Sequence, residues 1–484
     1  MGGARSRRFW IEVVKDWVEV VKEMKVSKRM NPKLAALLFV FASSLLLARG
    51  VWAQTATDVP DASRPRAEQA TVAEFFDPVA GMNADELVAR ALASNGELLA
   101  MRKEVEAARA LVRQAGARAN PRVDVSGAKS VNMPDNQLMA EGMLPLELGG
   151  RRAARVRVAE REAEAREAAL RDRERAVAAD VRAKFGEALA EILKLGVTED
   201  LLSNSQRGYR LVVARVMEGR TAPLEQNEVL VEVNRLRSLR EAGRGKVEVA
   251  LLELRNLVGA EASEPMKLRG DFDELIDALP SVADSTARAL NERPDLRAAR
   301  ASEALAEARI EEARAAGRAD AEVRAGYQRM RTGFPLNGIN NAGRLAPIED
   351  TFHSVTFGVS VTLPVRDRKA GAIEAAVAEL DAAKRRREFL ELTVRREVAA
   401  GYARYGAAAR SMEIYRVGVR GQAGQNLSVI RKTYELGAKT LLDYISEQRR
   451  YTELENDYIN AILETYLARV EIVRASASPE LTKK

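Results

Sequence analysis

Two spacings of hydrophobic residues alternate along this chain and divide it into helices and strands. Apolar positions step by three and four in the long segments, as at Val394, Val398 and Tyr402, which predicts helices of coiled-coil type. Between these segments the spacing changes to two, most clearly at Val355, Phe357 and neighbouring positions, which predicts strands. The expected order begins with a short helix from about 84 to 94, a break at Asn95-Gly96 and a second helix to about 119. Strands at 123–133 and 137–147, a long helix at 150–217 and a return helix at 223–258 follow. The second half has a helix at 285–313, strands at 321–331 and 354–363 joined by a loop at 332–352, a long helix at 369–435 and a return helix at 440–475.

The same order of elements occurs twice. Residues 87–115 resemble residues 285–313, the LPL of 144–146 resembles the LPV of 363–365, and EGRTAPLE (218–225) resembles LGAKTLLD (436–443). A duplication of this length fixes an architecture before any single residue is interpreted. We therefore predict a mainly α protein with a small β part, built as a duplicated helix–strand–strand–long helix–helix repeat. The predicted parts are a first repeat at 84–270, a second at 271–475, a flexible leader at 54–83 and a tail at 476–484.

The N-terminal 53 residues have the pattern of an export signal. A basic segment ends at Lys33, an apolar run covers 34–47, and small residues precede a predicted cleavage site after Ala53. The run is shorter than the ~20 apolar residues of a transmembrane helix, although an uncleaved anchor is the alternative. Either Met1 or Met30 is the start. We interpret residues 1–53 as a signal peptide region.

Charge and composition exclude several function classes. The formal net charge is +7, but the first 53 residues carry ten Lys/Arg against four Asp/Glu, which leaves 67 basic and 66 acidic residues in the remainder. The body therefore has no bias towards nucleic acid, and we interpret the basic run 384–387 as an exposed helix face. No catalytic motif, no cysteine and a single histidine, His353, are present. We expect no enzyme activity, no cofactor and no metal site in one chain, and we place His353 near one end of the fourth strand.

The four predicted strands are apolar on one face and polar or small on the other. An open sheet of this kind cannot exist in lipid, because its edges would leave backbone groups without hydrogen bonds. The strands must therefore be closed by copies from other subunits, and three chains would supply twelve strands, a number within the range of outer-membrane barrels. A soluble periplasmic coiled-coil scaffold is the alternative from a different class, and the alternating strands argue against it.

Two local motifs and the order of elements resemble a known family. PLELGGRR (145–152) and YELGAKTLLDYISEQRRY (434–451) are similar to segments of TolC-type outer membrane efflux factors, the first to the heavy-metal-efflux branch. The resemblance implies a homotrimer with a twelve-stranded outer-membrane β-barrel and an α-helical barrel spanning into the periplasm. It also implies a periplasmic adaptor, an inner-membrane resistance–nodulation–division pump, and outer membrane lipid as partners. The implied function is a passive exit duct for heavy-metal cations, with drug efflux or type I protein secretion as the alternative.

The resemblance also implies functional positions at the helix tips. Tyr434, Lys439 and Asp443 match gate residues of the family, whereas the second acidic position falls on Ser446, with Glu447 as a substitute. Asp443 has a second interpretation as a simple helix cap. The turns at the two tips are expected to face the adaptor, at Gly219, Leu224, Glu225, Gly437 and Leu442. The strand-to-helix crossings are assigned a structural role, at Pro145, Gly149, Gly150 and Pro364.

Overall fold

A computed structural model describes residues 72–131, 135–276 and 279–479. Contacts divide the chain into two units, Met1–Glu68 and Gln69–Lys484, and everything described below belongs to the second unit. The predicted signal peptide region and residues 54–71 of the predicted leader lie outside the described residues. The remainder is mainly helical, with one four-stranded sheet.

The first repeat follows the predicted order of elements. Asn83 begins it with a capping box that includes Glu86, and Asn95 separates the first two helices while capping the second through two backbone N–H groups. The second of these helices ends at Ala115, four residues earlier than predicted, and the first strand ends at Lys129 rather than Met133. Its elements are α4 (Ala84–Ser94), α5 (Gly96–Ala115), β1 (Arg122–Lys129), β2 (Asn136–Pro145), α6 (Arg151–Met217) and α7 (Pro223–Leu257).

The second repeat has the same elements with one interruption. The rod predicted at 369–435 is not a uniform α-helix, because a π-helical segment at Ile414–Val419 divides it. A π segment adds a residue per turn and so rotates the apolar face of the helix that follows. The elements are α8 (Phe272–Leu275), α9 (Val282–Glu292), α10 (Pro294–Ala316), β3 (Asp320–Ile339), β4 (Leu345–Thr362), α11 (Ala370–Glu413), α12 (Arg420–Glu435) and α13 (Leu441–Ala475).

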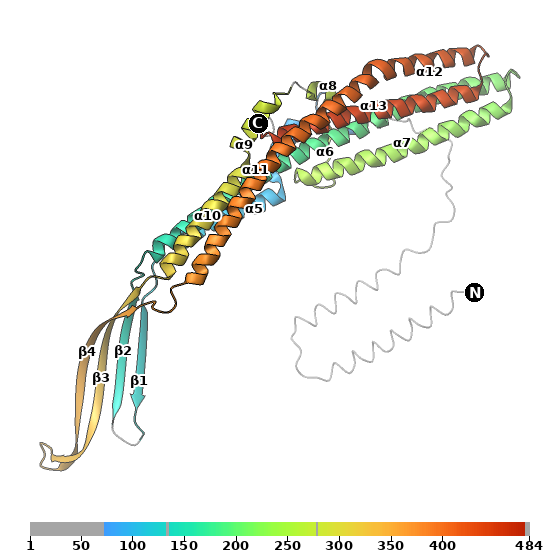
Figure 1. Cartoon of the computed structure of the whole chain (residues 1–484). Helices are drawn as coiled ribbons and strands as arrows, with labels where there is room; N and C mark the ends of the chain where they lie inside the picture. Colours follow the sequence, from blue (N-terminus) through green and yellow to red (C-terminus); the bar gives the residue numbers. More distant parts are fainter. Residues whose placement is uncertain (1–71, 132–134, 277–278, 480–484) are drawn as a thin grey trace, which may run out of the picture. The chain divides into compact units, whose positions relative to one another are not determined.

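The strands form an antiparallel sheet in the order β1-β2-β3-β4 (Figure 1). The predicted loop at 332–352 is wrong: β3 and β4 remain paired through most of it, with a register shift between Phe334 and Asn337, and turn at 340–344. Pairs such as Phe334 with Ile348 outweigh the Gly- and Asn-rich composition of this segment. His353 is consequently in the middle of β4 rather than near its end.

The predicted leader also differs at residues 72–83. The short helix α3 (Val72–Phe75) buries Phe75 in the main core, and Phe76 and Met82 each form a parallel bridge to Leu268. The backbone is held closely here, because a Cβ at Gly81 would lie 2.5 Å from the carbonyl oxygens of Asp77 and Leu268. This segment is packed because its aromatic side chains have a core to enter.

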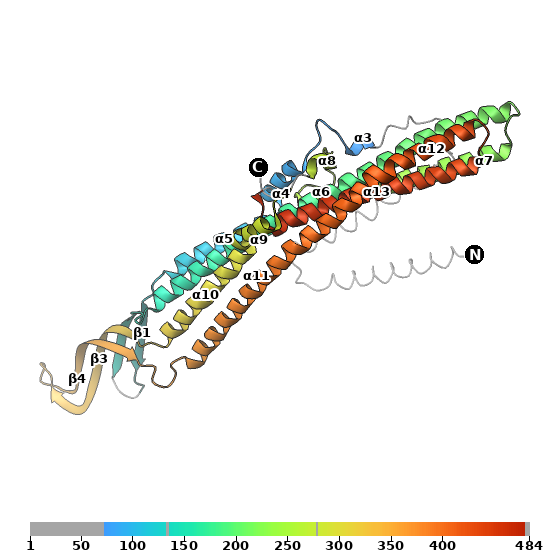
Figure 2. The same cartoon turned by 45° about the horizontal axis from the view of Figure 1, so that its top comes forward.

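Helix α6 is the element against which most others pack, and the main core lies along it. Phe185, Leu189 and Leu195 of α6 are buried with the return helices α7 and α13. Gly186 allows close approach, since a Cβ there would lie 2.4 Å from the ring of Tyr466. Figure 1 shows the sheet at one end of these helices and the α6–α7 and α12–α13 turns together at the other, as does Figure 2 from a second direction. Among the described residues, no helix is both long and apolar enough to cross a membrane.

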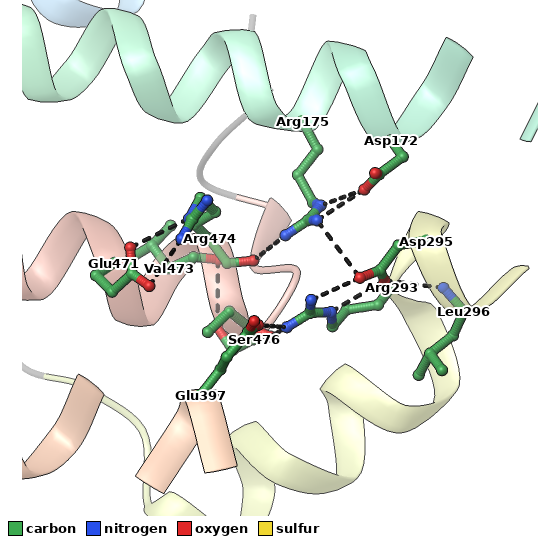
Figure 3. A network of polar contacts seen from close by, with 11 residues as sticks. Asp172, Arg175, Arg293, Asp295, Leu296, Glu397, Glu471, Val473, Arg474 and Ser476 are labelled. Atoms are coloured by element: carbon green, nitrogen blue, oxygen red, sulfur yellow. Dashed lines mark hydrogen bonds and ion pairs between the residues drawn. The ribbon is translucent and has the colours of Figure 1, made fainter. Parts of the chain in front are cut away.

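In each repeat, a side chain between the α4–α5 or α9–α10 helices binds the last carbonyl of that repeat's own return helix. We call this contact the closure of the repeat. In the first repeat, the Asn95 side chain donates to the carbonyl of Leu257 at 2.9 Å. In the second, Arg293 is 3% exposed and donates to the carbonyl of Ala475 at 3.2 Å. Figure 3 shows that Arg293 also binds Asp295 and Glu397, at 2.6 and 2.7 Å. The duplication thus repeats the closure but builds it from an amide in one copy and an ion network in the other.

Candidate functional site

The two helix tips have the same backbone geometry. Gly219 and Gly437, which are 218 positions apart, adopt φ angles of 71° and 80°. In each turn the next residue, Arg220 or Ala438, donates its N–H to the carbonyl five positions earlier, at 2.9 and 3.0 Å. This is the glycine-ended helix terminus in which only glycine adopts a positive φ without strain. Both glycines therefore have a structural role, since each ends its helix in this left-handed turn.

The return helices begin differently at the two tips. Thr440 caps α13 by accepting from the Asp443 N–H at 3.2 Å, and the Asp443 carboxylate accepts from the Thr440 N–H at 3.1 Å. Helix α7 begins with Ala222 and Pro223 and has no side-chain cap. Hydrogen bonds from Thr440 hold the pKa of Asp443 below its ordinary value. The cap interpretation of Asp443 is therefore confirmed.

Glu225 occupies the position in the first tip that Asp443 occupies in the second, but it makes a different contact. Its carboxylate accepts from the Tyr434 hydroxyl at 3.4 Å, across the two hairpins. The Tyr434 ring stacks on Tyr444, with centroids 5.8 Å apart and planes 1° from parallel. Burial, followed by the nearby Glu225 charge, raises the pKa of Tyr434. The structure thus brings Tyr434 into contact with Glu225. From the sequence, Tyr434 is assigned to the gate and Glu225 to the adaptor-facing turns.

The remaining predicted tip residues are on the surface. Leu224 and Leu442, which correspond between the repeats, are 66% and 70% exposed. Lys439 is exposed in its turn, and its charge contributes to lowering the pKa of Asp443. Ser446 is exposed and Glu447 is half-buried on the next turn of α13. The two tips therefore present one leucine each beside a short turn.

A layer of buried polar residues lies below the tips, and the sequence reasoning missed it. Gln448 of α13 donates to Ser205 of α6 at 3.4 Å and to Tyr444 at 3.1 Å. Glu232 of α7 binds Arg235 and, across to α13, Arg449 at 2.7 Å. The signal was available on α13, because its buried positions step by three and four and include polar side chains. These buried positions include Leu441, Ile445, Gln448, Glu455, Ile459 and Ile462, with one double step of seven from Gln448 to Glu455.

Two carboxylates in this layer, Glu232 and Glu455, are each paired with arginine. Burial raises the pKa of Glu232, but hydrogen bonds from Arg235 and Arg449 outweigh it and leave that pKa below the ordinary value. Glu455, 4% exposed, binds Arg420, which also lies 4.9 Å from the centre of the Tyr458 ring. Burial, with a hydrogen bond to Glu455, raises the pKa of Tyr451 to about 12. Removing one partner of such a pair would leave a buried charge.

The strand-to-helix crossing after β2 depends on two glycines. Gly149 and Gly150 have φ angles of 76° and 79°, and a Cβ on Gly149 would lie 2.7 Å from the Cβ of Arg318. Arg318 donates to the Gly149 carbonyl at 2.9 Å. Pro145 is the last residue of β2, and Pro364 follows the end of β4 by two residues. These contacts support a structural role for the crossing residues.

One face of the sheet is an exposed apolar band, which extends from the crossings to the row of Tyr327. The strand register places Val125, Ala140, Tyr327 and Val355 side by side in one row. Phe357 is 83% exposed although it is aromatic. From Val355 to Leu363 the band is about 26 Å long at ~3.3 Å per residue, close to the ~25 Å apolar band of outer-membrane barrels. Its exposed members are Val123, Val125, Leu144, Val323, Tyr327, Val355, Phe357, Val359 and Val361.

The opposite face of the sheet is polar. It carries Asp124, Glu141, Glu322 and Arg324 on β1 to β3, and Ser354, Thr356, Ser360 and Thr362 on β4. On the apolar side, the Tyr327 hydroxyl and His353 Nδ1 lie 2.6 Å apart. Among the described residues, no group of His, Cys, Asp or Glu could hold a metal ion. The fold therefore defines a two-part protein, with a sheet that is apolar on one face at one end and paired helical tips at the other.

Comparison with known families identifies the class. The sequence matches the family "Outer membrane efflux protein" twice in succession, at residues 87–260 and 286–478, and the chain belongs to this family. Its members are trimeric outer-membrane channel components of tripartite efflux pumps and are not enzymes. The two matches follow the duplication read from the sequence and decide against the scaffold alternative.

Characterised relatives carry metal-resistance names. The cobalt-zinc-cadmium resistance protein CzcC of Cupriavidus metallidurans is 24% identical over 79% of this chain and 87% of its own length. The nickel and cobalt resistance protein CnrC of the same species is 26% identical over 63% of this chain and 69% of its own length.

Solved structures share the fold. A membrane protein from Pseudomonas aeruginosa is 23% identical with a TM-score of 0.66, over 81% of this chain and 92% of that chain. CusC is 18% identical with a TM-score of 0.66, over 83% and 93%. The open state of the MtrE outer membrane channel of Neisseria gonorrhoeae is 17% identical with a TM-score of 0.63, over 87% and 95%.

Proposed function

We propose that this chain forms the trimeric outer-membrane duct of a tripartite pump that exports heavy-metal cations. The observation that carries the cargo is the similarity to CzcC over 87% of that protein, supported by CnrC and by the nickel-cobalt-cadmium resistance protein NccC. The duct is passive, and a periplasmic adaptor and an inner-membrane resistance–nodulation–division pump supply selection and energy.

The sheet supports closure by three copies. β1 and β4 are its edges, each paired on one side only. Pairing β4 of one copy with β1 of the next would remove all open edges, which lipid does not tolerate. Three copies give twelve strands with the apolar band facing lipid and the polar face lining a lumen. The helices, which continue from the crossings, would then form the periplasmic tube.

The gate is assigned to the second tip. Tyr434 holds the two hairpins together through Glu225, and Asp443 is an exposed carboxylate on the first turn of α13. Three copies of Asp443 around a narrow opening would concentrate negative potential and attract divalent cations. Opening requires the α12–α13 hairpin to move away from α6–α7, and the Tyr434–Glu225 contact would break in that movement.

The adaptor is expected to meet the tip turns. Leu224 and Leu442 are exposed apolar side chains beside Gly219 and Gly437, in equivalent positions of the two repeats. In a trimer they would recur six times around the end of the tube. An adaptor with six equivalent apolar sites could therefore bind Leu224 and Leu442 in the same way at every hairpin.

Metal tolerance tests the proposal. A strain that lacks this chain should grow less well on cobalt, zinc, cadmium or nickel, and the wild-type chain should restore growth. Asp443→Asn should restore it only in part, whereas Asp457→Asn, an exposed carboxylate on the same helix but away from the tip, should restore it fully. Unchanged tolerance to all four metals in the deletion strain would remove the cargo assignment.

A further inference from the structure

Charged residues on the apolar side of the sheet gather in one place. They lie beyond the band, on the side away from the helices, in the two rows that follow Tyr327 and in the adjoining part of β4. The register places Gly127, Leu138, Arg329 and His353 in the first row, and Lys129, Asn136, Arg331 and Thr351 in the second. We call Lys129, Arg329, Arg331 and His353 the basic collar. No charged residue of this face lies within the band itself.

The collar has positive charge available for a ligand. Arg331 pairs with Glu349 on β4. Lys129 and Arg329 are exposed, and within the described ranges neither side chain has a hydrogen-bond or ion-pair partner. At ~3.3 Å per residue along a strand and ~4.8 Å between strands, Arg329 and Arg331 are about 7 Å apart, and Lys129 is about 10 Å from Arg331. Three cations therefore share a small patch at the rim of the apolar surface.

The two faces of the sheet distribute charge differently, and this argues against a general solubilising role. On the polar face, Asp124, Glu141 and Glu322 lie level with the apolar band, together with Arg122 and Arg324. On the apolar face, charge begins only where the hydrocarbon layer would end. Charges that only kept the sheet soluble could lie anywhere along this face. Charges that contact lipid headgroups must lie beyond the edge of the apolar band, as these do.

We propose that the basic collar binds the phosphates of a phosphorylated lipid in the outer leaflet, and this proposal rests on the outer-membrane assignment above. The hairpin ends of the strands point away from the helices, so the collar would lie at the outer surface (Figure 1). Arg binds phosphate oxygens through two N–H groups, and Lys adds a point charge. The aliphatic parts of both side chains can rest on the band while their charged ends reach the headgroups. In a trimer the collar would occur three times around the barrel.

The experiment measures binding of a diphosphorylated glucosamine lipid to the purified full-length trimer by native mass spectrometry. Removing Lys129 and Arg329 together, as K129Q/R329Q, should weaken binding about 25-fold, since each cation near an anionic lipid surface contributes about fivefold. The matched control R122Q/R324Q removes two cations from the same two strands on the opposite face and should bind as the wild type does. The charge-conserving K129R/R329K should also retain binding.

Two further arms use the wild-type protein and do not depend on how the variants fold. The dephosphorylated lipid and inorganic phosphate should each bind more weakly than the complete lipid. The dephosphorylated lipid lacks the phosphates that would contact the collar, and inorganic phosphate lacks the acyl chains that would contact the band. Equal binding of the dephosphorylated lipid, or equal loss in K129Q/R329Q and R122Q/R324Q, would overturn the proposal. Channel activity of the same trimers is measured separately. Loss of lipid binding with normal channel activity would contradict only the lipid proposal, whereas absence of channel activity would contradict the proposed duct.

Discussion

The two helix tips share a backbone and differ in what their first-turn carboxylates do. Gly219 and Gly437 end the outgoing helices in the same way. Asp443 turns back to cap its own helix, whereas Glu225 reaches across to Tyr434. Duplication thus preserved the turn, which is determined by backbone geometry, and left the side chains free to specialise. Asp443 stabilises the start of its own helix in the second tip, whereas Glu225 of the first tip binds Tyr434 of the second.

The closures at the other end of the return helices differ in the same manner. Asn95 satisfies the end of α7 with a neutral amide, and Arg293 satisfies the end of α13 within a charged network. Arg175 of α6 joins that network by donating to the Arg474 carbonyl at 2.6 Å (Figure 3). The second repeat is therefore fixed firmly at its base and connected at its tip through Tyr434.

The largest effect is expected when the closures are removed. Arg293→Leu would leave the half-buried carboxylates of Asp295 and Glu397 without their main partner, and the loss of this buried cation should cost about 3–5 kcal/mol. Asn95→Ala removes neutral hydrogen bonds and should cost about 1–3 kcal/mol. Hydrogen exchange at the C-terminal turns of α13 and α7 measures each loss locally. Equal costs would mean that the charged network adds nothing to the closure.

A smaller and equal effect is expected at the two tip glycines. Gly219→Ala and Gly437→Ala each place a Cβ in a left-handed conformation and should cost about 1–2 kcal/mol. Nothing lies within 4 Å of a Cβ at either position, so the strain is confined to the backbone. Exchange protection of the last turns of α6 and α12 provides the measurement. A difference beyond about 1 kcal/mol would contradict the equivalence of the two turns.

The smallest effects concern the caps. Thr440→Ala should cost about 1 kcal/mol at the start of α13, and Ala222→Thr should stabilise the start of α7 by a similar amount. Because the pKa of Asp443 is lowered from 3.8, its contribution is fully present above that value and is lost only as pH falls through the lowered pKa. The effect of Thr440→Ala on exchange should therefore be the same at about pH 6 and about pH 8. A loss that grows over this range would contradict the cap.

The sequence predicted most elements because its two periodicities are strong and the chain repeats them. It failed where tertiary pairing outweighed local composition: at 332–352, where β3 and β4 extend each other, and at 72–83, where Phe75 finds a core. The π segment at Ile414–Val419 was not predicted because every residue in it is compatible with an α-helix. Propensity rules alone do not reveal a change of helical phase.

The site could be predicted only in part. The turns at Gly219 and Gly437 and the cap at Asp443 follow from local turn and cap chemistry, whereas their roles in a gate or in adaptor binding stay predictions. The contact between Tyr434 and Glu225 joins residues 209 positions apart and needs the fold. The burial of Gln448 and Glu455 could have been predicted from the sequence, since both are polar residues at apolar-face positions of α13. Their partners on α6 and α12 could not be assigned without the packing of the helices.

Single-channel recording of the purified trimer in planar bilayers tests the account most directly. The wild type should give stepwise currents, and Tyr434→Phe should raise the open fraction, because the contact that joins the second tip to Glu225 is lost. Tyr405→Phe, on α11 away from the tip, should leave the currents unchanged. Absence of current from a wild-type trimer, or identical currents from both variants, would contradict a duct gated at its second tip.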